Sequence, residues 1–183
     1  MRDDNISARI LGAAFPEIES EDPVAYFSRV AYPYHALCYS WLFWPNLISF
    51  HGAVFVAVEE HWHEFVSDRL SAPVSGVDIE SPPLSWSQAV RSFNIFEVSS
   101  FFRQWPESFE NTQEALEQLA HTLVETWSAK LLMFYPDRKF SVKLIDSDPS
   151  LELGIEVTQE SPELKTPSGW DPQRRFIASR EQS

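Results

Sequence analysis

The sequence contains one cysteine, Cys38, and only five glycines among 183 residues. A single cysteine cannot form a disulfide within the chain, and its neighbours Leu37 and Tyr39 predict a buried thiol that behaves as a small hydrophobic side chain. No glycine falls in a G-x-x-x-x-G-K or G-x-G-x-x-G loop, the two patterns that cradle phosphates. The lone cysteine indicates a reducing compartment, and the glycines give no support for nucleotide chemistry of these kinds.

Basic residues are also scarce, since 14 Lys and Arg stand against 27 Asp and Glu, with a formal net charge of -13. Binding to a phosphate backbone is driven by cationic side chains that displace counterions, so this balance argues against a nucleic-acid partner. An acidic surface keeps a protein soluble and, where a partner exists, favours a basic one through electrostatic steering. The charge therefore predicts either solubility alone or a basic protein partner.

Long hydrophobic runs are missing as well. The most aromatic stretch, residues 32–50, is interrupted by Pro33, Pro45 and polar residues, well below the roughly 20 apolar residues of a membrane-spanning helix. The amino terminus begins with acidic residues and leads into a short apolar run, unlike the basic start and long apolar core of a signal peptide. We therefore expect a cytoplasmic protein that is not embedded in a membrane.

Motifs for catalysis or metal binding are absent from the sequence, which has no G-x-S-x-G, H-E-x-x-H or C-x-x-C pattern. His61 and His63 are two residues apart and diverge on a helix, so they do not share an ion there. His121 and Glu125 are four apart and share a helix face, but two ligands alone are typical of a solvated flank. We assign no catalytic residue, cofactor or metal, although the abundant carboxylates leave acid–base chemistry open.

The composition is otherwise that of a folded domain, with 44% hydrophobic, 22% charged and 14% aromatic residues. A chain of 183 residues is long enough for one core and short for two. From Ser161 onward proline and glycine recur, and basic residues outnumber acidic ones. We therefore predict a single α+β domain over residues 1–160 and a net-basic tail over residues 161–183 that either hangs free or lies along the acidic body.

The aromatic stretch predicts a strand. Between Pro33 and Pro45, bulky residues at positions 37, 39, 41 and 43 alternate with residues that are mostly smaller. A period of two is typical of a strand with one bulky face and one small face. The pattern favours a strand over residues 36–43 whose aromatic side chains belong to the core rather than to a ligand platform.

A second strand and a helix follow along the chain. The unbroken apolar run at residues 53–58 indicates a central strand that is buried on both faces. Apolar residues then recur at helical spacing from Trp62 to Leu70. Glu59 and Glu60 precede them, and we place both in the first helical turn, where negative charge is favourable.

Two further helices are indicated by capping residues and periodicity. Ser85 is positioned to cap a short helix. A long apolar stripe that includes Trp127 predicts a helix over residues 112–134, with a capping box formed by Asn111 and Glu114. This long helix is the element that we expect to pack across the sheet.

Two alternating segments, residues 139–145 and 151–158, flank a turn-forming sequence and predict a β-hairpin. A four-residue loop sets these pairs opposite one another: Leu144 and Leu151, Val142 and Leu153, Phe140 and Ile155, Lys143 and Glu152, and Lys139 and Glu156. With the two earlier strands, the hairpin predicts one small, mainly antiparallel or mixed sheet of about four strands, packed against the long helix and two to three shorter helices.

Three alternatives for function follow. In its gross features the chain resembles bacterial immunity proteins, which bind and neutralise a toxin enzyme, and the resemblance implies a non-catalytic domain for a basic partner. The others are an enzyme using Glu and His in an aromatic-lined pocket, and a structural homodimer with aromatic residues at its interface. The candidate partner-binding residues are acidic and lie on two helices: Glu59, Glu60, Glu64 and Asp68 on one, and Glu114, Glu117 and Glu125 on the other.

Overall fold

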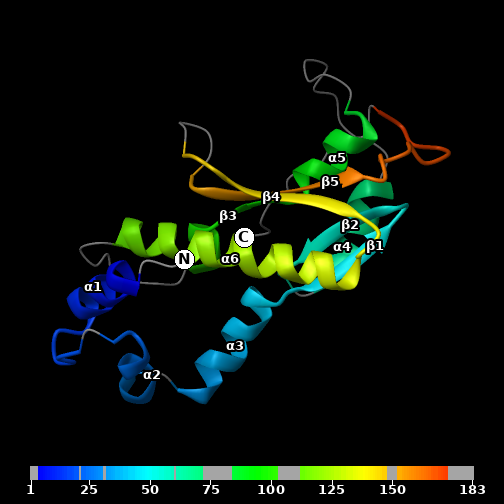
Figure 1. Ribbon diagram of the computed structural model, residues 1–183. Coiled ribbons are helices and arrows are strands. Elements are labelled where there is room, and N and C mark those ends of the chain that lie inside the picture. Colours follow the sequence, from blue (N-terminus) through cyan, green and yellow to red (C-terminus); the bar gives the residue numbers. More distant parts are fainter. Residues whose placement is uncertain are drawn as a thin grey trace, which may run out of the picture.

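The computed structural model describes residues 4–20, 22–30, 32–59, 61–71, 84–102, 112–147 and 152–172, and it has the predicted α+β architecture (Figure 1). The helices are α1 (Asp4–Ala14), α2 (Val24–Val30), α3 (Pro33–Phe43), α4 (Trp62–Ser71), α5 (Trp86–Ser92) and α6 (Thr112–Phe134), and a 3-10 turn, η1, spans Ser99–Phe102. The strands are β1 (Asn46–Phe50), β2 (Ala53–Ala57), β3 (Ile95–Glu97), β4 (Lys139–Ile145) and β5 (Gly154–Ser161).

The described strands form two small antiparallel sheets rather than one. β1 and β2 make a hairpin whose two turn residues, His51 and Gly52, have positive φ angles of 48° and 82°. Positive φ at both positions is the turn geometry that matches the right-handed twist of paired strands. The other sheet has the strand order β3-β5-β4. Both sheets nevertheless contribute to one buried cluster, so they share a core.

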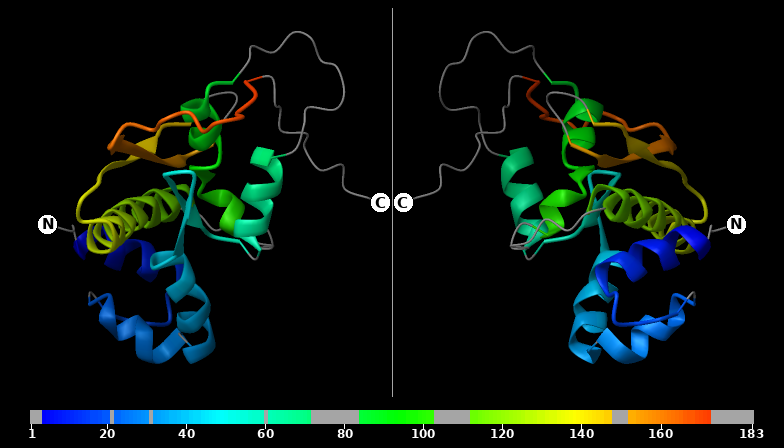
Figure 2. Two further views of the ribbon diagram at one scale, coloured as in Figure 1. Left: turned by 90° about the vertical axis from the view of Figure 1, so that its right-hand side faces the viewer. Right: turned by 90° about the vertical axis from the view of Figure 1, so that its left-hand side faces the viewer.

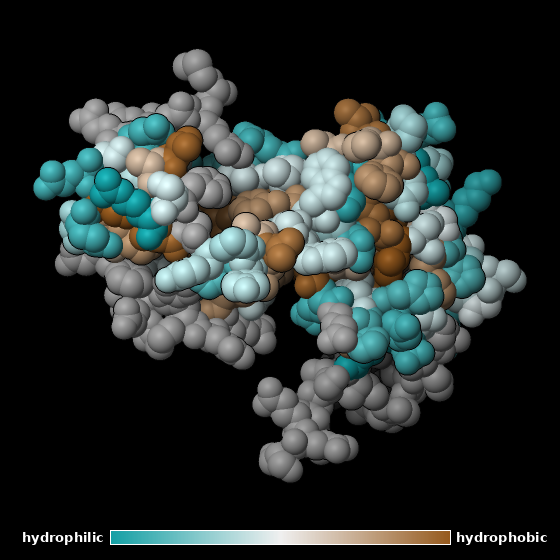
Figure 3. Space-filling model, turned by 90° about the horizontal axis from the view of Figure 1, so that it is seen from below, coloured by the Kyte–Doolittle hydropathy of each residue, from teal (hydrophilic) through white to brown (hydrophobic). Residues whose placement is uncertain are grey.

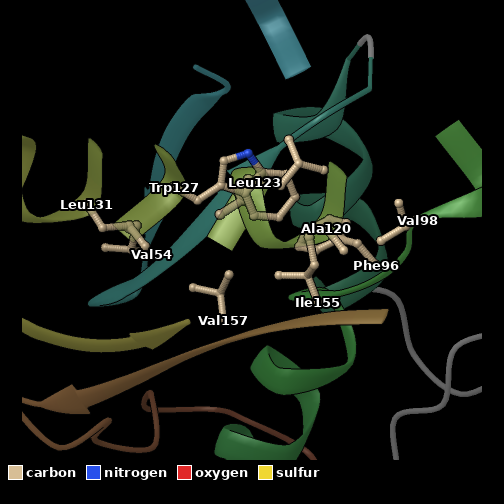
Figure 4. Close-up of a cluster of buried hydrophobic side chains, with 10 residues drawn as sticks. Val54, Phe96, Val98, Ala120, Leu123, Trp127, Leu131, Ile155 and Val157 are labelled. Carbon is tan, nitrogen blue, oxygen red and sulfur yellow. The ribbon is translucent and has the colours of Figure 1, made fainter. Parts of the chain in front are cut away.

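The main core lies between α6 and the two sheets, where side chains from α6, β2, β3 and β5 converge (Figure 4). Trp127 is 1% exposed, and Phe96 packs edge-on against it with 5.2 Å between the ring centroids. The predicted strand at residues 53–58 and the predicted helix at 112–134 are thus confirmed. Asn111, half of the predicted capping box, lies outside the described residues.

Asn94 joins the two sheets. Its side chain is 2% exposed, accepts a hydrogen bond from the Val56 N–H at 3.1 Å and donates one to the Val54 carbonyl at 2.9 Å. Its own backbone carbonyl accepts from the Val157 N–H of β5 at 2.9 Å. The side-chain amide therefore satisfies the β2 backbone as a neighbouring strand would, while the Asn94 backbone bonds to the other sheet.

The hairpin of β4 and β5 is confirmed, but its predicted register is wrong by four residues. Leu144 lies opposite Ile155, and Val142 lies opposite Val157. The connecting loop is longer than four residues because β5 begins only at Gly154. Registers that differ by an even number keep the same side chains on each face, so alternation alone does not distinguish them. In both registers Ile155 and Val157 lie on the same face of the hairpin, and in the structure this face is buried in the main core.

The predicted strand over residues 36–43 is wrong, because this segment is helix α3. Pro33 occupies the first helical turn, where its missing N–H and restricted φ are tolerated, and Pro45 follows the cap residue Trp44. The two prolines that limit the predicted strand are therefore the start and stop signals of a helix. Nearly all side chains between them are apolar, so an alternating pattern appears in a segment that is helical.

A second buried cluster packs β2 against α4 and α5. Alternate residues of β2 face the two clusters, since Val54 and Val56 belong to the main core and Ala53 and Phe55 to the second. This alternation explains how one apolar strand is buried on both faces. It also confirms the sequence-based prediction for β2.

The first part of the predicted tail lies against this second cluster. Trp170 packs on Trp86 with 5.1 Å between ring centroids, and its indole N–H donates to the Leu84 carbonyl at 3.2 Å. Ser85 caps α5 as predicted, with its hydroxyl accepting from the Gln88 N–H at 3.3 Å. Residues 173–183 of the tail lie outside the described part of the chain.

Candidate protein-interaction surface

Helix α3 has no buried residue, although its sequence, PYHALCYSWLF, is mostly apolar and has no Asp, Glu, Lys or Arg. The uncharged stretch of sequence extends from Val30 to Val58. In space α3 lies on the side of α6 that faces away from the β3-β5-β4 sheet (Figure 2). A helix that is apolar on all sides normally lies inside a protein or a membrane, so its exposure marks a surface that another molecule can cover.

Four exposed side chains form a stripe along α3 and its cap, which we call the aromatic seam. They are Tyr34, Leu37, Trp41 and Trp44, with exposed fractions of 76%, 64%, 62% and 41%. Spacings of three, four and three residues place them within a sector of about 80° at 100° per residue. Figure 3 views this side of the molecule, where pale and brown surface occupies much of the middle. The spacing is visible in the sequence, but it identifies a seam only when the segment is read as a helix.

The opposite side of α3 attaches the helix to the body. Leu42 and Phe43 pack against the main core, and the ring centroid of Tyr39 lies 6.3 Å from that of Phe102. Trp127 of α6 donates its indole N–H to the Leu42 carbonyl at 2.8 Å. These anchoring side chains lie about half a turn around the helix from the seam, so the seam faces away from the body.

The carboxyl end of α6 adds to this apolar surface. Lys130, which is 6% exposed, donates to the Trp44 carbonyl at 3.0 Å, and its Nζ lies 5.3 Å and 5.2 Å from the ring centroids of Trp44 and Phe134. Burial lowers the pKa of Lys130. Phe134 is 56% exposed, and its neighbours Leu132 and Met133 are 65% and 70% exposed. Lys130 thus bridges the seam to the exposed end of α6.

Cys38, predicted to be buried, is exposed on α3. The prediction depended on a strand whose small face would be covered by other elements. On the helix, Cys38 lies within about 60° of Tyr34 and Trp41 at 100° per residue, so it flanks the seam. The reactivity of the Cys38 thiol should therefore fall when another molecule covers this surface.

The first predicted acidic group is only partly assembled by α4. Glu64 and Asp68, one turn apart on this helix, are both exposed. Glu59 is exposed but precedes α4, which begins at Trp62, so its predicted place in the first helical turn is wrong. Glu60 lies outside the described residues.

The second acidic group lies on α6. Glu117 and Glu125 are exposed, as is His121 between them, whereas Glu114 is half-buried and forms an ion pair with Arg9 of α1. Glu114 therefore helps to hold α1 on α6, and the exposed flank of the helix carries the other two carboxylates. Within the described ranges, no three His, Cys, Asp or Glu side chains are placed to hold a metal ion.

A buried carboxylate lies on β5. Glu156 is 3% exposed and forms ion pairs with Arg91 of α5 and with Lys143 of β4, the latter at 3.0 Å. Burial raises the pKa of Glu156, but hydrogen bonds and positive charge from Arg91 and Lys143 outweigh this effect and hold it below its ordinary value. The predicted register pairs Glu156 with Lys139, and the observed one brings Lys143 to it instead. This cluster fixes α5 to the sheet.

No helix in the part of the chain that the structure describes has the length and hydropathy needed to cross a bilayer. Comparison with known proteins found no matching family model and no significantly similar curated protein or solved structure. Function must therefore be inferred from the geometry of the exposed surfaces.

Proposed function

We propose that the protein is a non-catalytic protein-binding domain, and that its contact surface is the aromatic seam together with the carboxyl end of α6. The observation that carries the proposal is an apolar helix without a buried residue. Trp and Tyr anchor many protein interfaces because they offer a large contact area with few rotatable bonds. Covering these side chains removes apolar surface from water, which is the main driving force of association.

The seam is presented in a fixed position. The carbonyl groups of Leu42 and Trp44 both accept hydrogen bonds from α6, one from Trp127 and one from Lys130. A helix that is already held in place loses little conformational freedom when a partner binds, and this favours affinity. The α6 anchor therefore supports a preformed binding surface.

Geometry favours binding over the enzyme alternative. Glu117, His121 and Glu125 share a helix flank on which all three side chains are exposed. Catalytic acids and bases are usually tuned by burial, and the side chains on this helix flank are exposed to solvent. A binding role makes no such demand on these residues.

A photo-crosslinking amino acid at position 41 tests the proposal in the native host. We expect a discrete crosslinked species that is lost when Leu37→Glu is added, because the charge disrupts the apolar contact. The same crosslinker at Gln113, an exposed position at the start of α6, serves as the control. If position 41 yields no specific product under conditions where the protein is abundant, the seam is not a contact surface and the proposal fails.

A second candidate is recognition of a basic protein by the acidic helices, the role that the likeness to immunity proteins suggests. It is supported by the net charge of -13 and by the exposed pair Glu64 and Asp68 on α4. Electrostatic recognition acts mainly on the association rate and is screened by salt. We expect Glu64→Lys with Asp68→Lys to slow association with a basic partner at least tenfold at low salt. A rate that depends on neither these residues nor salt would contradict this role.

A further inference from the structure

We infer that the aromatic seam pairs with the seam of a second copy of this chain, with the two α3 helices antiparallel across a twofold axis. The inference rests on the proposed function, because it names the occupant of the same surface. Three independent features of the seam favour a second copy over another partner: its spacing, its lack of charge and its area.

The spacing is that of a helix–helix contact. Tyr34, Leu37, Trp41 and Trp44 occupy successive a and d positions of a heptad, the pattern that packs one helix against another. In an antiparallel pair centred near residue 39, Leu37 meets Trp41 of the second copy and Tyr34 meets Trp44 of the second copy. Each contact then occurs twice, as a twofold axis requires. The seam is therefore self-complementary, with each Trp opposite a smaller side chain, either Leu37 or Tyr34.

The lack of charge selects the same occupant. At a net charge of -13, two copies of the chain repel each other wherever their carboxylates approach within about 10 Å, the screening length at moderate salt. The uncharged stretch from Val30 to Val58 includes all of α3, so pairing through the seam brings no carboxylate of α3 against another. A basic partner, in contrast, would find no carboxylate on α3 and would be steered to the acidic helices.

The exposed area suits a dimer. With about 150–250 Å² for each large side chain, the seam alone exposes on the order of 500 Å² at the observed fractions. Met133 and Phe134, which lie nearer to Lys130 around α6, bring the total to roughly 750 Å². Stable interfaces bury about 800 Å² on each partner, so the surface is close to the size that a specific dimer needs.

Cys38 provides a built-in reporter of this geometry. It is the one cysteine in the chain, it is exposed, and it lies near the middle of α3 beside the seam. A twofold axis near residue 39 brings the two Cys38 side chains to the same part of the interface. A short bifunctional maleimide should therefore join two copies, and every such product must link Cys38 to Cys38.

Sedimentation of the purified full chain tests the inference. We expect the wild type to behave as a dimer of twice 21.1 kDa at micromolar concentration, and Leu37→Glu with Trp41→Glu to weaken dimerisation at least 100-fold. Ser49→Glu, at an exposed position of β1 within the same uncharged stretch, adds charge away from the helix and is the control. The inference is overturned if the wild type stays monomeric at about 100 µM or if the dimer survives the double substitution. It is also overturned if Ser49→Glu weakens dimerisation as much as the double substitution does.

Crosslinking at Cys38 keeps the test independent of variant folding. Wild-type protein should give a covalent dimer with the short maleimide, and Cys38→Ser should give none. A sedimenting dimer without this product would overturn the antiparallel arrangement. In the position-41 experiment above, a product of any mass other than twice the chain overturns the second copy as occupant while leaving the proposed function intact, whereas no product removes both.

Discussion

Strand β2 and helix α3 are neighbours in the sequence, similarly apolar and free of charge, yet they have opposite environments. Residues 53–56 of β2 are at most 2% exposed, whereas α3 has no buried residue. β2 is covered because α6 and β5 pack on one face, α4 and α5 pack on the other, and β1 and Asn94 satisfy its edges. In the described part of the chain, α3 is anchored to the main core through Leu42 and Phe43 in its last turn. Apolar composition therefore demands a partner, but it does not say whether the partner lies in the same chain.

Two tryptophan substitutions test this comparison with the largest expected effect. Trp127→Ala should lower the free energy of unfolding by about 3–5 kcal/mol, because it removes a buried ring from the main core and leaves a cavity. Trp41→Ala should change it by less than about 0.5 kcal/mol, since that ring is on the surface.

Chemical denaturation measures both variants. The protein concentration must be low enough that further dilution does not move the midpoint, so that self-association does not contribute. Comparable losses in the two variants would show that the α3 side chains belong to the core, and the contrast with β2 would be lost.

Asn94→Ala tests whether the Asn94 side chain is what allows the backbone edge of β2 to be buried. The substitution leaves the Val56 N–H and the Val54 carbonyl without their side-chain partner inside the protein, and each unsatisfied group costs about 1–3 kcal/mol. We expect a loss of about 2–4 kcal/mol and faster hydrogen exchange at the Val56 amide. Asn46→Ala, at an exposed position in β1, is the control. Unchanged exchange at Val56 would mean that the Asn94 amide does not protect the strand.

Glu156→Gln tests the ion pairs that hold β5 beneath α5. We expect a loss of about 1–2 kcal/mol at pH 7, at the low end for charged hydrogen bonds, because Arg91 and Lys143 are more than half exposed and water can solvate them. The folded pKa of Glu156 is lowered, so its contribution is present above the unfolded value, about 4.3, and is lost as pH falls through the folded value.

Acid titration of stability distinguishes this contribution. As the pH falls below about 5, the wild type should progressively lose its stability advantage over Glu156→Gln. Glu117→Gln, on the exposed flank of α6, is the control substitution. Parallel acid profiles for the wild type and Glu156→Gln would contradict a coupled carboxylate at this position.

The smallest expected effect concerns the exposed flank of α6. If Glu117, His121 and Glu125 form a solvated or partner-binding flank, zinc should leave the melting temperature unchanged, because a ligand stabilises a fold only by binding the folded state. Differential scanning calorimetry with and without zinc gives the answer. A clear rise in melting temperature that His121→Ala abolishes would restore a metal site on α6.

Local patterns were sufficient for several elements. The apolar stripe around Trp127 predicts α6, the run at residues 53–58 predicts β2, and Ser85 predicts the cap of α5, because each depends on residues close in sequence. The α+β class follows from these elements together. The helices α1 and α2 lacked a comparable signal, and residues 4–30 carried no prediction.

Contacts between segments far apart in the chain determined the features that the sequence did not predict. The nearly all-apolar segment between Pro33 and Pro45 fits both the period of a strand and the period of a helix, and only its place at the edge of the body shows that it is an exposed helix. The hairpin register was not determined by alternation, because registers that differ by an even number keep the same side chains on each face. The side chain of Asn94, which links the two sheets, carried no signal in the sequence. Composition and short-range pattern thus established the class of fold and its long elements, because these reflect local backbone preference and burial. The tertiary structure determined which apolar side chains remain exposed, because that is set by contacts between segments far apart in the chain.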